Sequence, residues 1–261
     1  MSKIKVIVLR AAGTNCDQET AFAFEKVGAV AELVHINRLI NGDKDLKDYQ
    51  ILAIPGGFTY GDDIASGKIL ANELRYKLEY DIERFIKKGK LIIGICNGFQ
   101  VLVKAGLLPG LTGAGQIEST LTLNDSARFE ARWVYLKKEN SQCVWTRGIP
   151  ELLYLPVAHG EGKFTAKDET VLRLLDSEGL VAFRYVDQNG KYAGYPANPN
   201  GSADHIAGIC DQTGRIFGLM PHPERYIEHT QHPRWTRQGS AKEGDGLAIF
   251  RSGVDYAKKS L

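Results

Sequence analysis

Apolar runs alternate with amphipathic stretches along the first part of the chain. Four of these runs are rich in β-branched residues and have the length of buried strands: 5–9, 31–36, 50–54 and 91–95. Between and after them, the spacing of apolar residues predicts helices at about 17–27, 68–88 and 98–104. Strands that alternate with helices predict a parallel sheet whose two faces are covered by helices.

The pattern changes in the second half of the chain. From about residue 121 to 217, short apolar segments alternate with turns that contain Gly and Asn, and four of them are predicted to be strands: 131–136, 170–175, 181–185 and 205–209. We expect this portion to be antiparallel and to pack on the first sheet rather than to form a separate domain. A further apolar strand is predicted at 216–220.

The C-terminal part combines a polar segment with a helical pattern. The stretch 228–245 is poor in apolar residues and predicts a loop. Leu247, Phe250 and Val254 then recur at helical spacing and predict a closing helix. We therefore expect one α/β domain over residues 1–261, with the polar loop and the closing helix from about residue 228.

Composition and charge exclude several classes of protein. The 261 residues carry a formal net charge of +2, which gives no basic face for nucleic acid. The apolar run near the N-terminus is too short for a membrane span or a secretory leader. The four cysteines are widely spaced, so neither a disulfide framework nor a zinc ribbon is expected. These features predict a cytosolic protein without nucleic-acid or membrane partners.

The segment that carries most chemical information is 94–100, Gly-Ile-Cys-Asn-Gly-Phe-Gln, directly after an apolar strand. Between a strand and a helix it places Cys96 on a nucleophile elbow, where Gly94 and Gly98 leave room for the tight bend. The N-terminus of the following helix favours the thiolate, which is the reactive form. The pattern predicts an enzyme that forms a covalent thioester on Cys96.

A cysteine nucleophile needs a base, and His222 is the strongest candidate. It lies between two prolines that favour an extended backbone, so Glu224 would point to the same side and could hold the imidazole. Because His222 and Cys96 both follow predicted strands, one sheet edge would bring them together. Alternatively, His222 is only a rigid loop residue beside a surface carboxylate.

The oxyanion that forms during such an attack needs backbone N–H donors. One is expected from Asn97, the residue after the nucleophile, and another from Gly56 or Gly57 after a different strand. The alternative for the two glycines is a simple turn. Of the remaining cysteines, Cys143 and Cys210 are interpreted as small buried residues, and Cys16 lies in a loop before a helix. All three are expected to be dispensable for the chemistry.

Metal and nucleotide sites have little support in the sequence. Two His-x-Glu groups occur, at His159 and His222, but no zinc-site partner motif accompanies them. A metal site is therefore not predicted. No phosphate-binding glycine motif is present either, so neither ATP nor a dinucleotide is expected on this chain.

Together these motifs resemble a known family. The segments GICNGFQ (94–100), PGGFTYGDD (55–63) and PHPE (221–224) resemble the class I, or triad, glutamine amidotransferases. Four others are similar to the glutaminase subunits of phosphoribosylformylglycinamidine synthases: GTNCD (13–17), NDSARFEARW (124–133), VAHGEGKF (157–164) and YPANPNGS (195–202). The resemblance runs in order from about residue 5 to 226, and no motif is assigned beyond it.

The resemblance implies a doubly wound, mostly parallel α/β sheet of the flavodoxin-like kind, with an additional antiparallel portion. It implies a catalytic triad of Cys96, His222 and Glu224. It further implies that glutamine is held by Gln100 and by the loop of His159, Gly160 and Glu161. Segment 128–130 would form either a wall of the site or a contact with a partner, and both alternatives stay open.

For this family the implied reaction is hydrolysis of glutamine to glutamate and ammonia. The ammonia would pass to a synthetase subunit that converts formylglycinamide ribonucleotide with ATP, in de novo purine biosynthesis. The resemblance therefore places ATP and Mg²⁺ on that partner and no cofactor on this chain, and a further possible partner is a small accessory subunit. Two alternatives remain: a cysteine hydrolase of the same broad fold with another amide or peptide substrate, and a binding module with an inert cysteine.

Overall fold

The computed structural model describes residues 3–113, 115–237 and 243–261. Within them a nine-stranded sheet has the strand order β2-β1-β3-β4-β11-β10-β9-β6-β7, and β5 and β8 form a separate two-stranded ribbon. The strands of the parallel half are β1 (Lys5–Arg10), β2 (Val30–His35), β3 (Ile51–Ile54), β4 (Leu91–Ile95) and β11 (Ile216–Leu219). The other strands are β5 (Ser119–Leu123), β6 (Glu130–Lys138), β7 (Leu152–His159), β8 (Glu161–Ala166), β9 (Val181–Val186) and β10 (Ile206–Cys210).

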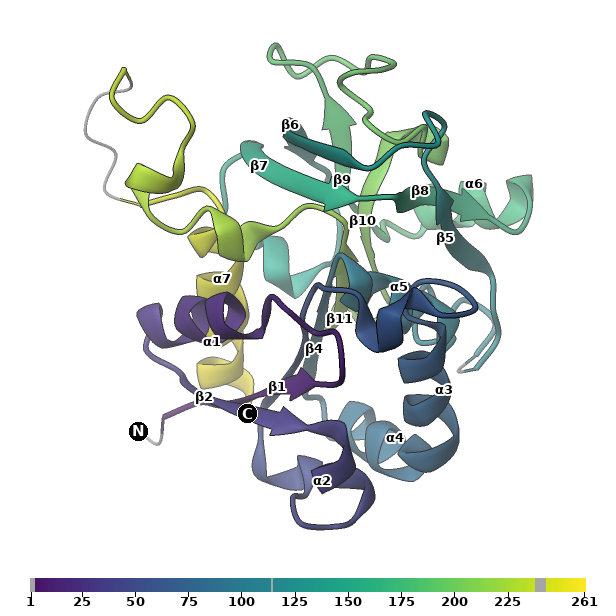
Figure 1. Cartoon of the computed structure of the whole chain (residues 1–261), viewed down its shortest axis with the longest axis vertical. Coiled ribbons are helices and arrows are strands. Elements are labelled where there is room, and N and C mark those ends of the chain that lie inside the picture. Colours follow the sequence, from purple (N-terminus) through teal and green to yellow (C-terminus); the bar gives the residue numbers. More distant parts are fainter. Residues whose placement is uncertain (1–2, 114, 238–242) are drawn as a thin grey trace.

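Helices cover both faces of the parallel half, as the alternation of patterns predicts. The α-helices are α1 (Asp17–Lys26), α2 (Ile36–Ile40), α3 (Lys68–Lys77), α4 (Glu79–Lys87), α5 (Asn97–Lys104), α6 (Glu169–Ser177) and α7 (Leu247–Ser260). Figure 1 shows α1 and α7 together on one side of the central strands, and α3, α4 and α5 on the other. The doubly wound α/β fold is confirmed.

The core lies where the central strands meet these helices. All residues of β3 and β4 are buried, as is expected for strands covered on both faces. Between α1 and α7, the ring of Phe24 packs edge-on against Phe250 and Trp145, with ring centroids 4.9 and 6.5 Å away. The predicted closing helix is thus α7, which completes the layer that α1 begins.

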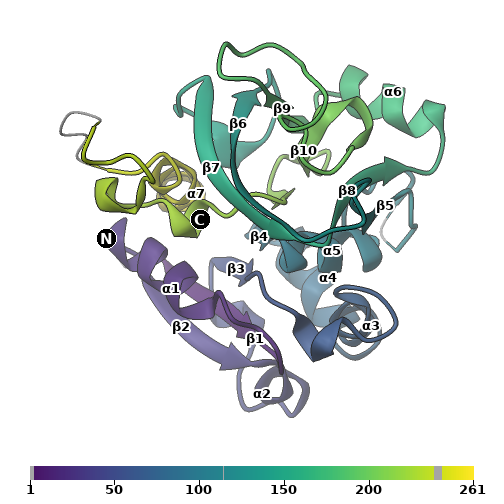
Figure 2. The same ribbon diagram turned by 45° about the horizontal axis from the view of Figure 1, so that its top comes forward.

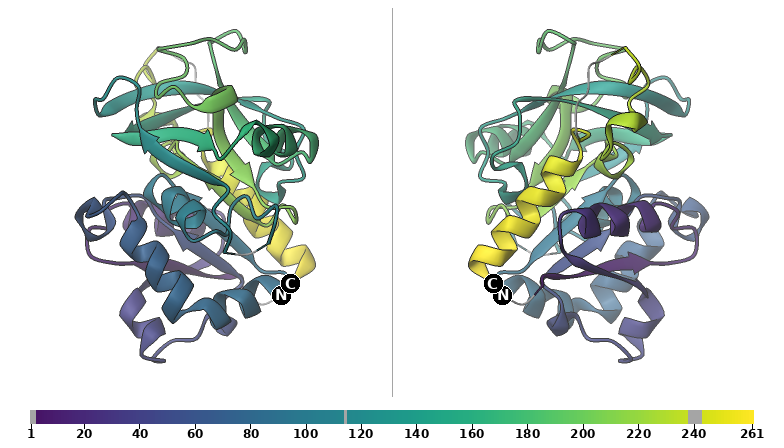
Figure 3. Two further views of the ribbon diagram at one scale, coloured as in Figure 1. Left: turned by 90° about the vertical axis from the view of Figure 1, so that its right-hand side faces the viewer. Right: turned by 90° about the vertical axis from the view of Figure 1, so that its left-hand side faces the viewer.

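The antiparallel portion differs in one respect from the expectation. It does not pack on the first sheet: β10 pairs antiparallel with β11, and β9, β6 and β7 continue the same sheet outward. Figures 2 and 3 show this half, in teal and green, lying beside the parallel half in purple and blue. Hydrogen bonding along β11 therefore joins the two halves directly.

One predicted helix and one predicted strand need correction. The expected helix over 68–88 is interrupted at Leu78 (φ −121°), which separates α3 from α4. Leu74, Leu78 and Ile82 are all buried, so the apolar spacing runs through the break and does not reveal it.

The expected strand at 170–175 is part of helix α6. Its N-cap is Asp168, whose side chain accepts a hydrogen bond from the Val171 N–H at 2.9 Å. Val171 and Leu175 are the buried residues of this helix, four positions apart. A short apolar run fits both a helix and a strand, and the N-cap decides between them here.

The polar segment after the last strand is only partly a loop. It contains the 3₁₀ turn η6 (His229–Gln231), and His232 is buried among the rings of Trp133, Tyr154 and Tyr226, with centroids 5.5–5.6 Å away. Residues 238–242 of the predicted loop lie outside the described residues. In the described ranges, we find no helix with the length and apolar character needed to cross a bilayer.

Candidate active site

Cys96 occupies the sharp bend between β4 and α5, as the glycine pattern predicts. Its backbone has φ 52° and ψ −107°, a conformation that non-glycine residues rarely adopt. A Cβ atom at Gly98 would collide with the Ile54 carbonyl oxygen, and one at Gly94 would lie 2.5 Å from the Gly98 oxygen. The Cys96 N–H donates to the Leu219 carbonyl at 2.8 Å and ties the elbow to β11. The bend at Cys96 is thus held by close backbone packing at Gly94 and Gly98 and by the hydrogen bond to β11.

His222 and Glu224 lie after the neighbouring parallel strand. Ile95 and Leu219 are register partners at the ends of β4 and β11, so the residues that follow them leave the sheet at the same edge. His222 Nδ1 lies 2.6 Å from Glu224 Oε1, and both side chains are buried. Glu224 reaches the ring from a 3₁₀ turn, η5 (Pro223–Arg225), rather than from the extended chain that the sequence predicts.

The site residues meet at Gly56, which lies two residues after the end of β3. A Cβ atom there would lie 2.9 Å from His222 Cε1 and 3.4 Å from Cys96 Cβ. The carboxyl ends of three neighbouring parallel strands, β3, β4 and β11, thus bring together Gly56, Cys96 and His222. Across the site from β7, the Ala158 carbonyl lies 3.8 Å from Cys96 Sγ.

The electrostatics of His222 favour a charged ring. Burial by itself lowers the pKa of His222, but the negative charges of Glu224 and of the Cys96 thiolate more than offset it. The resulting pKa of His222 lies well above its ordinary value. An imidazolium at this place can stabilise a thiolate and can donate a proton.

The two candidate oxyanion glycines are held by the loop after β1. The Gly56 carbonyl accepts from the N–H groups of Asn15 and Cys16, at 3.4 and 3.2 Å. Because C=O and the next N–H point in opposite directions across a trans peptide, the Gly57 N–H points away from that loop. Gly57 has φ 145°, and a Cβ there would lie 2.7 Å from the Gly13 oxygen.

Asn97 links the elbow through its side chain to segment 55–63 after β3, which contains the two candidate oxyanion glycines and is called the oxyanion loop below. Its Oδ1 accepts from the Thr59 hydroxyl at 2.6 Å, and its Nδ2 donates to Asp62 and Gln100 at 3.1 and 2.9 Å. Burial raises the pKa of Asp62. This network holds the segment after Gly57 close to the first turn of α5.

The candidate substrate residues fall into two groups. Gln100 and Glu161 are brought together, since Gln100 Nε2 donates to the Glu161 carbonyl. Gly160 lies beside them at the turn between β7 and β8, with the Phe129 ring 4.0 Å from where its Cβ would be. The roles of these residues toward glutamine stay predictions.

His159 is held differently, with its ring packed against Gly162. Its Nδ1 lies 3.0 Å from Asn124 Oδ1, which also accepts from the Gly162 N–H at 3.1 Å. Burial lowers the pKa of His159 to about 3, so the ring is neutral near pH 7. These contacts hold the His159 ring between β7 and the turn that carries Asn124, and its role toward glutamine stays a prediction.

Segment 128–130 is divided between surface and interior. The Phe129 ring is half exposed and lies 6.4 Å from the ring of Phe58, which is also exposed. Glu130 is buried and forms an ion pair with Arg132 at 2.5 Å. The Phe129 ring thus lies beside that of Phe58, while the Glu130 side chain is held in the interior by Arg132 and Ser126.

Cys16 and Arg225 are site residues that sequence reasoning did not assign. Cys16 Sγ lies 4.0 Å from His222 Nδ1, and the Arg225 guanidinium donates to the same sulfur at 3.0 Å. For Arg225 the signal in the sequence was its position directly after the PHPE motif (221–224). For Cys16 it was the family-like segment GTNCD (13–17), in a loop before a helix.

A metal ion could in principle be bound by three of these side chains. The ligand atoms of Cys16, His222 and Glu224 lie within 4.8 Å of one another. However, Glu224 already engages His222 Nδ1, and the positive guanidinium of Arg225 touches the Cys16 sulfur. Both features fit a hydrogen-bonded catalytic pair better than a cation site.

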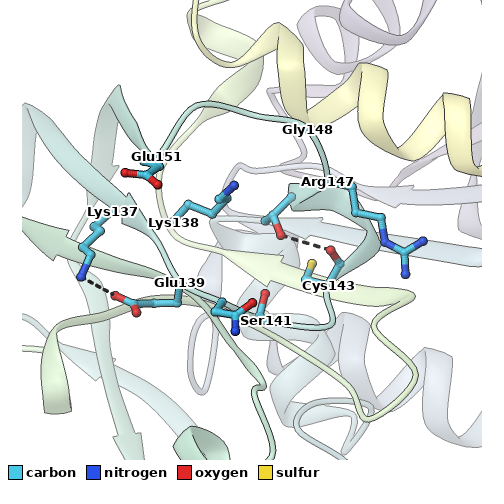
Figure 4. A pocket seen from close by; sticks show the side chains of 10 residues that line it. Lys137, Lys138, Glu139, Ser141, Cys143, Arg147, Gly148 and Glu151 are labelled. Carbon is cyan, nitrogen blue, oxygen red and sulfur yellow. Dashed lines mark hydrogen bonds and ion pairs between the residues drawn. The ribbon is translucent and has the colours of Figure 1, made fainter.

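A concave region lies away from this site. A hollow of about 590 Å³ is bordered by the end of β6 and the segment after it, with Lys137, Glu139, Cys143 and Arg147 on its rim (Figure 4). Its lining includes none of the residues that meet at Gly56. Cys143 therefore belongs to a different environment from Cys16 and Cys96.

The chain belongs to the family of CobB/CobQ-like glutamine amidotransferase domains, whose profile matches residues 3–257. An elbow cysteine beside a His–Glu pair is the arrangement that the class I resemblance predicts. Two solved structures, of a putative GMP synthase component from Thermoplasma acidophilum and of a glutamine amidotransferase from Thermotoga maritima, share the fold at TM-scores of 0.57 and 0.51. Their sequence identities are 15% and 16%, with 99% of this chain covered in each case and 96% and 94% of theirs.

Within the family, the chain is similar over its whole length to PurQ, which is one of the subunits of phosphoribosylformylglycinamidine synthase. The PurQ of Dehalococcoides mccartyi is 53% identical, over 99% of this chain and 100% of its own. The PurQ of Methanocaldococcus jannaschii is 37% identical, over 98% of this chain and 100% of its own. A chain in the structure of PurLQS from Thermotoga maritima has a TM-score of 0.74 and 33% identity, over 98% of this chain and 99% of its own.

Proposed function

We propose that this chain is the glutaminase subunit of a phosphoribosylformylglycinamidine synthase. The observation that carries the proposal is the meeting of Cys96 with the buried His222–Glu224 pair, in a chain similar to PurQ over its full length. The reaction is hydrolysis of glutamine to glutamate and ammonia in purine biosynthesis.

The first half of the reaction forms the thioester. The Cys96 thiolate attacks the side-chain amide carbon of glutamine and leaves a negative charge on the amide oxygen. The N–H groups of Asn97 and of Gly56 or Gly57 stabilise that oxyanion. His222, as imidazolium, gives its proton to the leaving nitrogen, and ammonia departs.

The second half releases glutamate. A water molecule attacks the thioester carbonyl while the neutral imidazole of His222 accepts the proton of the water. The tetrahedral intermediate then collapses, and the Cys96 thiolate leaves beside the regenerated imidazolium. Glu224 stabilises the charged ring in both halves through its contact at 2.6 Å.

A synthetase partner uses the ammonia. The solved relative from Thermotoga maritima comes from a PurLQS structure, and this supports two partners for this chain, a small accessory subunit and a synthetase subunit. We assign ATP and Mg²⁺ to the synthetase, which converts formylglycinamide ribonucleotide to formylglycinamidine ribonucleotide. No metal takes part in the proposed hydrolysis. We place the reaction in the cytosol, which suits four cysteines that are all free thiols.

The test is reconstitution of the purified chain with its native synthetase and accessory subunits, with ATP and formylglycinamide ribonucleotide supplied. Release of glutamate matched by formylglycinamidine ribonucleotide supports the proposal. Hydrolysis of another amide or a peptide without hydrolysis of glutamine would instead identify a cysteine hydrolase of the same fold. If a glutamine-like electrophile failed to label Cys96, an inert binding module would be the better interpretation.

A further inference from the structure

Cys16 is a thiol next to the catalytic pair that the proposed mechanism does not use. It is fully buried at the N-cap of α1, and its Sγ lies 4.0 Å from His222 Nδ1. That nitrogen is the one that faces Glu224 Oε1. The Cys16 sulfur thus borders the contact that orients the imidazole.

The same sulfur is an acceptor for Arg225, the residue after Glu224. Arg225 Nη2 donates to Cys16 Sγ at 3.0 Å, and Arg225 Nε lies 3.5 Å from Glu19 Oε1 on α1. Both contacts tie the turn η5 to the start of α1. Since η5 carries Glu224, the Cys16–Arg225 contact fixes the position of that carboxylate relative to the ring.

The backbone of Cys16 leaves its sulfur little freedom. The Cys16 N–H donates to the Gly56 carbonyl at 3.2 Å, and the Cys16 carbonyl accepts from the Thr20 hydroxyl at 2.6 Å. The sulfur itself lies 3.2 Å from the position that a Gly56 Cβ would take. Cys16 is therefore anchored between the oxyanion loop and the His222–Glu224 pair.

We propose that Cys16 is a positioning residue for glutamine hydrolysis: its sulfur anchors the Arg225 guanidinium and thereby holds Glu224 in register with His222. This inference rests on the proposed function. Cys16 does not act as a nucleophile here, because it lies outside the elbow. Burial raises the pKa of its thiol and keeps it neutral, as suits a group that accepts from Arg225 and donates to Asn15 Oδ1 at 3.1 Å.

Without the sulfur, the turn η5 loses one of the two contacts by which Arg225 ties it to α1. The Glu224 carboxylate, which η5 carries, would then be held less firmly against His222. The imidazole would then lose the orientation that proton transfer to the leaving nitrogen needs. A misplacement of about 1 Å at a reacting group can lower kcat by roughly 100-fold, so a smaller shift of the imidazole should lower it by roughly tenfold.

The experiment compares three variants with the wild-type chain in the reconstituted synthase. Cys16→Ala should lower kcat for glutamine hydrolysis roughly tenfold, with KM changed by less than about twofold, since Cys16 is not placed on the substrate. Cys16→Ser keeps an acceptor for Arg225 and should stay within about threefold of wild-type kcat. Cys143→Ala is the matched control: it removes another fully buried thiol, far from His222, and should keep wild-type kcat.

A double-mutant cycle tests the link to Arg225. Arg225→Met keeps most of the apolar stem but removes the guanidinium, and should lower kcat about as much as Cys16→Ala. The Cys16→Ala, Arg225→Met double variant should be no slower than the slower single variant. Multiplicative losses would show that the two residues act independently and would overturn the proposal.

Thermal unfolding of each variant separates positioning from folding. A Cys16→Ala chain with wild-type Tm and wild-type kcat overturns the inference, as does a Cys16→Ser chain that is as slow as Cys16→Ala. If Cys16→Ala does not fold, Arg225→Met decides, because wild-type kcat in that variant contradicts the anchor. Failure of the wild-type chain to hydrolyse glutamine would instead refute the proposed function itself.

Discussion

At the scale of single residues, the site depends on a strained cysteine and a buried charged pair. Cys96 adopts φ 52°, which the fold tolerates because glycines on both sides leave room for the backbone. His222 and Glu224 are almost fully buried, and mutual attraction rather than solvent stabilises their charges. Small changes at these residues should therefore have large effects on rate.

The first prediction concerns the nucleophile. Cys96→Ala should abolish glutamine hydrolysis, because no other cysteine lies on the elbow. Cys143→Ala and Cys210→Ala should retain most of the activity, since both thiols are buried elsewhere. The measurement is glutamate release together with mass spectrometry of the trapped thioester. A glutamyl thioester on a different residue would refute the mechanism.

The second prediction separates His222 from Glu224. His222→Ala should lower kcat by roughly 10²–10⁴-fold, the usual contribution of general acid–base catalysis. Glu224→Gln should cost less, because the amide still holds the ring. If both variants were near wild type, the assignment of His222 as the base would be wrong.

The charge of Glu224 also predicts a change in pH dependence. Glu224 raises the pKa of His222, so its removal should lower that pKa. The imidazolium that protonates the leaving nitrogen would then disappear at a lower pH. The alkaline limb of the kcat profile should move to lower pH in Glu224→Gln, and an unchanged limb would contradict the assignment.

At the scale of elements, the elbow depends on close packing of α5 against β3. A Cβ at Gly98 would collide with the backbone carbonyl of Ile54, which cannot move without disturbing the ladder between β3 and β4. Because only glycine fits at position 98, the glycines around Cys96 indicate the elbow from the sequence alone.

A fourth prediction follows from that contact. Gly98→Ala should lower the free energy of unfolding by roughly 2–3 kcal/mol, measured by urea denaturation. Gly194→Ala is the control, because no atom lies within 4 Å of where its Cβ would be, and it should stay within about 0.5 kcal/mol of wild type. Equal stabilities of the two variants would contradict the packing argument.

At the scale of the whole molecule, ammonia release must be coupled to a partner. The sequence has no recognisable phosphate-binding motif with which this chain could activate an acceptor. We expect the isolated chain to be a weak glutaminase that the synthetase activates by ordering the oxyanion loop. A misdirected oxyanion donor costs roughly 10²–10³-fold in kcat.

The fifth prediction is tested by measuring glutamate release by the chain alone and by the complete synthase. Equal turnover in the two cases would refute activation, although the Cys96 chemistry would stand. Ammonium chloride should replace glutamine for the synthetase without this chain. That result would identify ammonia as the group that passes between the subunits.

The sequence by itself determined the parallel half of the fold and the catalytic candidates. Strand 91–95 and the residues of its elbow agree with the structure because steric limits on a tight bend leave few sequences that fit it. The positions of Cys96 and His222 after strands were enough to predict their meeting, since parallel strands end at one edge.

Only the tertiary structure decided the remaining features. The break at Leu78, the helix at 169–177 and the continuation of the sheet beyond β11 depend on which neighbours bury each apolar face. Cys16 joins the site for a similar reason: it lies 209 residues before Arg225 in the chain, and no local pattern encodes their contact. Steric limits within a short segment can be inferred from its sequence. Contacts between distant segments exist only once the chain has folded.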